Sequence, residues 1–130
     1  MGVVPSNISG SKNTAVGHSA LQSHNSGREN VAVGYVALRD NTVGEWNVAL
    51  GKGALLFNSN GGSRNIAIGD NALYEASGPN ADTNVAMGIF AGACVTTGCH
   101  NLLIGTCKTG FCITTGGHNT IIGRFAGHGK

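Results

Sequence analysis

The stretch Asn30-Val-Ala-Val-Gly34 decides the fold of this chain, because it returns seven times within 130 residues. The other copies are Asn13-Thr-Ala-Val-Gly17, Asn47-Val-Ala-Leu-Gly51, Asn65-Ile-Ala-Ile-Gly69, Asn84-Val-Ala-Met-Gly88, Asn101-Leu-Leu-Ile-Gly105 and Asn119-Thr-Ile-Ile-Gly123. Their asparagines are 17, 17, 18, 19, 17 and 18 positions apart. A repeat this short and regular is typical of a solenoid, in which each copy is one coil stacked on the last. We therefore predict an all-β, parallel β-solenoid of about seven coils of 17–19 residues.

Each pentapeptide predicts a short strand, in which Val31 and Val33 share one face and Ala32 lies on the other. We expect the larger side chains to form the dry interior of the solenoid. The small middle residue should then face a closely packed second chain. The expected interior pairs are Val31/Val33, Val48/Leu50, Ile66/Ile68, Val85/Met87, Leu102/Ile104 and Thr120/Ile122, and the middle residues are Ala15, Ala32, Ala49, Ala67, Ala86, Leu103 and Ile121.

The repeated glycines and asparagines predict the corners of the coil. Glycine after each strand suits a tight corner with positive φ, and Asn-rich and Gly-rich stretches such as 41–44 and 58–61 suit a second turn. The asparagines predict a stacked amide ladder that satisfies turn backbone groups, and the alternative is ligand binding by repeated amides. The repeated positions are Asn13, Asn30, Asn47, Asn65, Asn84, Asn101 and Asn119, with Gly17, Gly34, Gly51, Gly69, Gly88, Gly105 and Gly123.

Composition limits the classes of function. The chain is rich in Gly (22 residues), low in charged residues (11%) and carries a net charge of +2 with no basic cluster, which argues against nucleic-acid binding. No segment reaches the length of a membrane span, and no signal peptide is visible at the start. Residues 1–130 are expected to form one repeat domain. Neither end has an atypical capping coil, so we expect a fragment of a longer fibre, or ends covered by partners.

The pattern changes at Gly88, which divides the chain into regular coils over 7–87 and altered coils, rich in Cys, Thr and Gly, over 88–130. The Ala-Leu pair that follows each strand, as in Ala37-Leu38, becomes Ala91-Gly92. We expect a distinct tip or junction in the altered coils, and we hypothesise a binding role there.

The motif Asn-x-Ala-Val/Ile-Gly-x-x-Ala-Leu, as in residues 30–38, resembles two groups of fibrous proteins. One is the head repeat of trimeric autotransporter adhesins, a left-handed parallel β-roll with shorter coils than these. The other, which looks closer, is the shaft repeat of phage tail fibres and similar bacterial surface fibres. The resemblance covers residues 7–127 and implies a homotrimer that attaches to a cell surface or spaces a fibre, with the altered coils as a departure.

All four cysteines lie in the altered coils: Cys94, Cys99, Cys107 and Cys112. Cys94 and Cys112 both stand seven residues before a repeat Asn, so a disulfide between adjacent coils is one prediction. Small apolar filler is the other, and it suits Cys107, which aligns with Phe90 and Phe125.

His100 and His118 share a column beside Cys99, which makes these three residues candidates for a metal site. The same column holds Lys12, Glu29, Trp46, Arg64 and Thr83 in the other coils, and such variety is typical of an exposed surface. We therefore expect solvated surface there, with no metal and no cofactor.

Tyr35, Trp46 and Tyr74 are candidates for a surface that stacks on sugar rings, with functionless exposure as the alternative. The six carboxylates form no readable catalytic pair, so no enzyme is expected. A Thr array of the ice-binding kind would need more than the two coils with Thr pairs at 96–97 and 114–115, which argues against a monomeric ligand-binding solenoid.

The interpretation is a structural segment of a viral or phage attachment fibre that presents a receptor-binding surface. It would act as a homotrimer on a virion surface or outside the cell, with a cell-surface glycan or protein as receptor, no nucleic acid and no membrane insertion. The alternative is the head of a bacterial trimeric adhesin that binds glycan or matrix directly.

Overall fold

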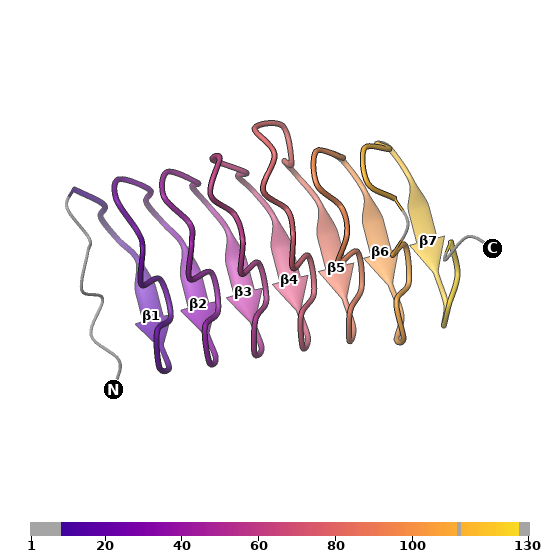
Figure 1. Cartoon of the computed structure of the whole chain (residues 1–130), viewed down its shortest axis with the longest axis horizontal. Helices are drawn as coiled ribbons and strands as arrows, with labels where there is room; N and C mark the ends of the chain where they lie inside the picture. Colours follow the sequence, from indigo (N-terminus) through magenta and orange to yellow (C-terminus); the bar gives the residue numbers. More distant parts are fainter. Residues whose placement is uncertain (1–8, 112, 128–130) are drawn as a thin grey trace.

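The computed structural model describes residues 9–111 and 113–127, which wind into a parallel β-solenoid with one strand in each coil (Figure 1). This confirms the predicted fold class. The strands are β1 (Thr14–Val16), β2 (Val31–Val33), β3 (Val48–Leu50), β4 (Ile66–Ile68), β5 (Val85–Met87), β6 (Leu102–Ile104) and β7 (Thr120–Ile122).

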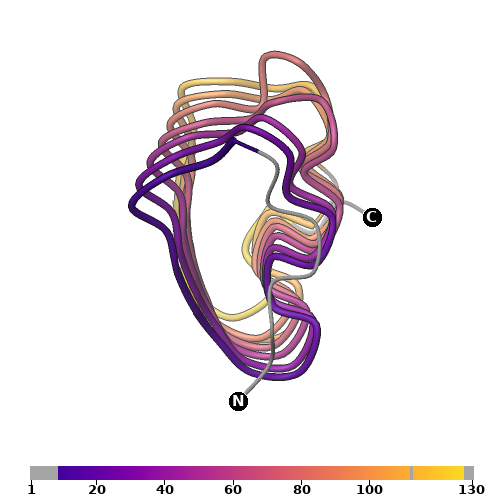
Figure 2. The ribbon, with the colours of Figure 1, turned by 90° about the vertical axis from the view of Figure 1, so that its left-hand side faces the viewer.

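The seven strands form a single parallel sheet in the order of the sequence. Each repeat position pairs with the same position of the next coil, as Ala32 pairs with Ala49 and Ala49 with Ala67. The sheet continues without a break through the change of pattern at Gly88, since β5 pairs with β6 and β6 with β7 in the same register. Viewed along the stack, each coil is a closed ring with one side folded inward (Figure 2).

The strands face the opposite way from our prediction. The middle residue Ala32 points into the solenoid and is 0% exposed, whereas Val33 points outward and is 37% exposed. The same holds for Ala49, Ala67, Ala86 and Leu103, which are fully buried, and Ala15 in the first coil is half-buried. The prediction that the larger residues line the interior, and that the alanines face a second chain, is therefore wrong.

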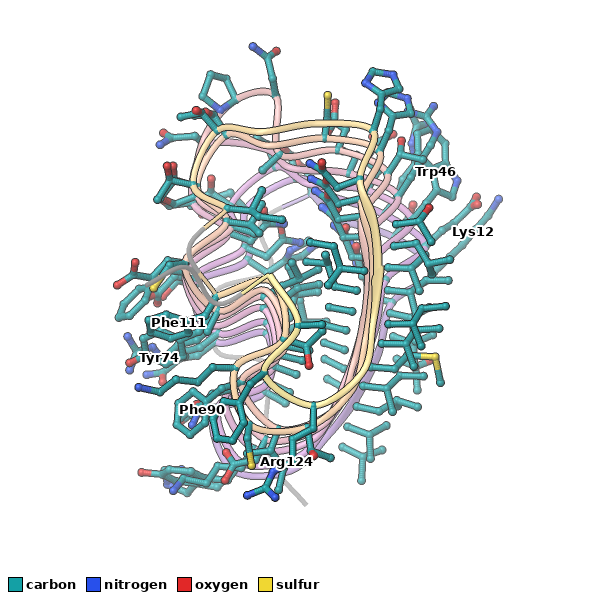
Figure 3. The ribbon with its side chains drawn as sticks, turned by 90° about the vertical axis from the view of Figure 1, so that its right-hand side faces the viewer. Lys12, Trp46, Tyr74, Phe90, Phe111 and Arg124 are labelled. Carbon is teal, nitrogen blue, oxygen red and sulfur yellow. The ribbon has the colours of Figure 1, made fainter. Side chains whose placement is uncertain are left out.

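The reason lies in the inward fold of the opposite wall. In the first four coils that fold, which Figure 3 shows facing the strands, carries one buried leucine, so that only a methyl group fits on the strand side of the core. The buried leucines are Leu21, Leu38, Leu55 and Leu73. Alternation shows which residues share a face but not which face is inside, and in this coil the size of the opposite residue decides it.

The last two coils keep the same interior with the sizes exchanged, whereas the coil of β5 has small residues at both positions, Ala86 and Gly92, next to Leu103 of the following coil. In β6 the middle residue is Leu103, and the wall position that is leucine in earlier coils is Gly110. A Cβ on Gly110 would lie 2.7 Å from Leu103 Cδ2, and a Cβ on Gly127 would lie 2.6 Å from Ile121 Cδ1. The large side chain has moved from the wall to the strand, which explains the loss of Leu after Gly88.

The repeated asparagines form the predicted amide ladder. Asn47 is fully buried, its Oδ1 accepts from the backbone N–H of Asn65 at 2.9 Å, and its Nδ2 donates to the carbonyl of Gly62 at 2.9 Å. The same Oδ1-to-backbone bond links every pair of successive repeat asparagines at 2.9–3.1 Å. These buried amides hold the turn together and are not accessible to a ligand, so the structural interpretation is confirmed.

A second buried column faces the interior on the other side of the turn. In the first coils it is polar, with His24, Asn41 and Asn58 all fully buried. His24 lies 2.9 Å from the carbonyl of Asn41 through Nδ1 and 2.7 Å from that of Gly27 through Nε2. In later coils the same column is apolar, with Ala76, Val95 and Ile113. This second column is therefore hydrogen-bonded at one end of the solenoid and apolar at the other, while the amide ladder continues through both.

Candidate functional site

The outward face of the sheet is a flat, uncharged, mostly aliphatic surface. It is made of the first and third residues of each strand, here called the strand face. These residues are Thr14, Val16, Val31, Val33, Val48, Leu50, Ile66, Ile68, Val85, Met87, Leu102, Ile104, Thr120 and Ile122. None is fully buried, and Val16, Val33, Ile66, Met87 and Ile122 are exposed. A continuous apolar sheet surface of this kind marks an interaction site.

Polar columns border the strand face on both sides. The corner before each strand carries Lys12, Glu29, Trp46, Arg64, Thr83, His100 and His118, here called the corner column. The corner after each strand carries His18, Tyr35, Lys52, Asp70, Ile89, Thr106 and Arg124. An apolar centre with a mostly polar rim is the usual anatomy of a protein interface.

Trp46 is the centre of a surface network in the corner column. Its indole N–H donates to Glu29 Oε2 at 2.8 Å, and the Arg64 guanidinium carbon lies 4.6 Å from the ring centroid. Lys12 Nζ lies 3.3 Å from Glu29 Oε1. The hydrogen bond from Trp46, followed by that from Lys12, lowers the pKa of Glu29. Trp46 is thus exposed, as predicted, and its neighbours orient it.

The three aromatic candidates do not converge. Trp46 lies in the corner column, Tyr35 on the corner after the strand, and Tyr74 on the wall opposite the strand face (Figure 3). Tyr35 is exposed and stacks on His18 with ring centroids 5.6 Å apart, whereas Tyr74 is half-buried against Phe57. No shared sugar site is formed by these three rings.

The cysteines are distributed over the altered coils. Cys94, Cys99 and Cys107 are half-buried, no disulfide joins any two of them, and Cys112 lies outside the described residues. Cys107 is an additional residue in its coil. Lys108 N donates to Ile89 O of the preceding coil, just as Phe90 N donates to Asp70 O one coil earlier. The alignment of Cys107 with Phe90 is therefore wrong, because Lys108 lies opposite Phe90, whereas Phe125 N bonds to Thr106 O and so lies opposite Cys107, as aligned.

His100 and His118 stack with ring centroids 4.9 Å apart and an angle of 6° between their planes. Both are exposed, as expected for the corner column, and Cys99 lies beside them. Among the residues that the structure describes, no three His, Cys, Asp or Glu side chains gather as a set of metal ligands. Two exposed imidazoles do not make the closed four-ligand site that a structural zinc ion requires.

The carboxylates are dispersed, and three of them pair with cations. Besides Glu29, Glu45 Oε1 lies 2.9 Å from Arg28 Nε, and Asp40 Oδ2 lies 2.8 Å from Arg39 Nη2. Asp82 accepts from the backbone N–H of Ser63 at 2.6 Å. The contacts of Glu29, Glu45 and Asp82 link neighbouring coils, and the Arg39–Asp40 pair lies within one coil. None of these contacts brings two carboxylates together for acid–base chemistry.

Sequence reasoning missed one column of side chains in the altered coils. Phe90, Lys108 and Phe125 lie on successive coils at the far side of the corner after the strand, with Lys108 opposite Phe90 and Phe125 opposite Cys107, the neighbour of Lys108. Earlier coils have Ser19, Val36, Gly53 and Asn71 at this position. The signal was present as the exchange of small or turn-forming residues for large ones. The additional residue Cys107 concealed it, because it shifts Lys108 by one position.

Comparison of the chain with models of protein families, with curated proteins and with solved structures finds no match. Within the described residues there is also no helix with the length and apolar character needed to cross a membrane.

Proposed function

We propose that this chain is a structural segment of an attachment fibre, viral or bacterial, in which three copies pack through their strand faces. Its work is mechanical: a stiff rod that spaces and presents a receptor-binding surface outside the cell or on a virion. The observation that carries the proposal is the strand face, an uncharged and mostly apolar surface that continues along the whole sheet.

The strand face is suited to a second copy of the same chain. It repeats at every coil, so copies aligned along a common axis would match residue by residue over the whole length of the sheet. With strands about 4.8 Å apart, seven of them give a stripe about 30 Å long. If the copies are related by a rotation axis parallel to the stack, each coil of one copy faces the same coil of the next copy, and a fibre needs this register.

The number three comes from the resemblance to tail-fibre shafts and trimeric adhesins. Two copies packed face to face would also cover the strand face, so the mass of the assembly distinguishes the two arrangements. In either arrangement the corner columns and the opposite wall stay on the outside, where a receptor can reach them.

The proposal is tested by placing a charge in the strand face. Ile66→Lys puts an ammonium group in the middle of the sheet at a position that is exposed in the single chain, so the coil itself accommodates it. In a packed interface the same charge would be buried without a partner, at a cost of about 3–5 kcal/mol. We expect this variant to be a folded monomer when its mass is measured by light scattering.

Thr83→Lys is the matched control, since it adds the same charge on the corner column and should leave the mass of the assembly unchanged. Circular dichroism of both variants confirms that the solenoid is intact. A folded Ile66→Lys variant with the mass of the unmodified assembly would contradict the proposal.

A further inference from the structure

The column Phe90, Lys108 and Phe125, here called the aromatic–cationic column, is built from residues that its backbone disfavours. The φ angles are 55°, 68° and 58°, in the left-handed region where bulky side chains are strained. Earlier coils fill the equivalent position with Ser19, Val36, Gly53 and Asn71, all of them also at positive φ. The backbone conformation is therefore shared by every coil, and the last three coils differ in carrying long aromatic or cationic side chains there.

The side chains of this column are accessible. Phe90 is 37% exposed and Phe125 is 48% exposed, and they flank the exposed Lys108 on adjacent coils. Phe111 lies next to them, with Lys108 Nζ 4.6 Å from its ring centroid, and Arg124 Cζ lies 5.0 Å from the ring of Phe125. Figure 3 shows Phe90 and Phe111 on the wall opposite the strand face, and Arg124 at the corner between that wall and the strands.

The charge in this part of the chain has one sign. No Asp or Glu follows Asp82, so residues 83–130 carry Lys108, Arg124 and Lys130 with no carboxylate. In the described part of the chain, neither Lys108 nor Arg124 forms an ion pair. Of the other described cations, Lys12, Arg28 and Arg39 are each paired with an acid, and Lys52 and Arg64 are not. It is the lack of acidic side chains after Asp82 that sets this part of the chain apart. An anionic group is the complementary ligand.

The backbone N–H groups at the column already donate hydrogen bonds to the preceding coils, and this limits the kind of ligand. Phe90 N donates to Asp70 O, Lys108 N to Ile89 O and Phe125 N to Thr106 O. A peptide that adds as a strand needs unpaired backbone groups, and this column offers side chains only. Apolar ring faces next to cations suit a pyranose ring that carries an acidic substituent.

We propose that the aromatic–cationic column, with Phe111 and Arg124, binds an acidic glycan at the outward side of the fibre. Phe90 and Phe125 would pack on sugar rings, and Lys108 and Arg124 would bind the carboxylate or sulfate groups. This inference rests on the proposed fibre function and names the chemistry of its receptor. It also accounts for the change of pattern at Gly88, which builds this surface in the last three coils.

The test measures binding of the unmodified chain to four immobilised probes at one ionic strength: sialyllactose, a heparin oligosaccharide, neutral lactose and polyglutamate. We expect binding to one of the two acidic sugars, with the carboxylated and sulfated probes distinguishing which substituent is recognised. Lactose and polyglutamate should bind at least about tenfold more weakly. Binding to neither acidic sugar, or equal binding to polyglutamate, would overturn the proposal.

Two double variants separate the contributions of rings and charges. Phe90→Asn with Phe125→Asn introduces a residue that suits the left-handed corner, and Lys108→Gln with Arg124→Gln removes the cations. Each should weaken sugar binding at least about tenfold, whereas Arg64→Gln on the corner column should leave it unchanged. The variant with two Asn substitutions should unfold at no lower denaturant concentration than the unmodified chain, so its loss of binding cannot come from misfolding.

Equal loss in the Arg64→Gln control, or unchanged binding in the Asn variant, would contradict the site. The mass of each sample is measured in parallel. A correct assembly that binds no acidic sugar overturns this inference alone, and a chain that stays monomeric overturns the fibre proposal instead.

Discussion

Leu103 Cδ2 lies 2.7 Å from the point where a Cβ on Gly110 would be, so the two residues share one space in the core. Earlier coils fill this space from the wall, as Leu38 does, and keep an alanine on the strand, as at Ala32. Both arrangements place one large and one small residue across a thin interior. The coil therefore tolerates either order of sizes but not two large residues.

We predict that Gly110→Ala destabilises the chain by about 1–3 kcal/mol, because the added methyl overlaps Leu103 and the backbone is left-handed there. Leu103→Ala alone should cost about 2–5 kcal/mol through the cavity it leaves. The double variant should lose less stability than the sum of the two single losses, by about 1 kcal/mol or more. Denaturant unfolding measures all three, and strictly additive changes would show that the residues do not share this space.

Asn47→Ala should be among the more damaging single changes in the chain. It leaves the backbone N–H of Asn65 buried without its acceptor, while the carbonyl of Gly62 keeps the bond from Asn58 Nδ2 at 2.7 Å. An unsatisfied buried group costs about 1–3 kcal/mol, so a loss of about that size in the free energy of unfolding is expected. The exposed Asn60→Ala is the matched control and should change stability by less than about 0.5 kcal/mol. Equal effects at both positions would refute the ladder as a source of stability.

Trp46 is the one tryptophan of the chain, so its fluorescence reports on the Glu29 contact directly. The pKa of Glu29 is lowered by the hydrogen bond from Trp46 and then by Lys12. A lowered pKa means that the contact is present above the ordinary pKa of a glutamate and is lost as pH falls through the lower folded value. We expect a change in Trp46 emission with a midpoint below the glutamate reference value of 4.5.

Glu29→Gln should abolish this acid transition, while Glu45→Gln, which removes a carboxylate paired with Arg28, should preserve it. An emission change that survives in Glu29→Gln would assign the transition to another group.

Much of the fold could be predicted from the repeat itself. The spacing of the asparagines placed every strand, and the turn chemistry of Asn and Gly placed the corners and the amide ladder. The orientation of the strands could not be predicted from alternation, because Val33 and Ala32 are both compatible with an interior. The deciding information is the leucine six residues further on in the same coil, which leaves room for alanine only.

The surfaces were harder to predict than the fold. The corner column was recognisable, since its residue types vary from coil to coil and its members are exposed. The aromatic–cationic column was hidden, because Cys107 adds one residue and only the hydrogen bond from Lys108 N to Ile89 O restores the alignment. The absence of carboxylates after Asp82 was readable from the sequence, but without this column it pointed to no ligand.

The central claim is that copies of this chain pack through the strand face, and the mass of the unmodified chain in solution tests it most directly. Light scattering over a range of concentrations, with and without reductant, should give the mass of three chains of 13.1 kDa each under both conditions. Survival in reductant is expected because apolar packing, not disulfide bonds, holds the assembly together. A mass of 13.1 kDa at every concentration would contradict the claim and leave the strand face without a function.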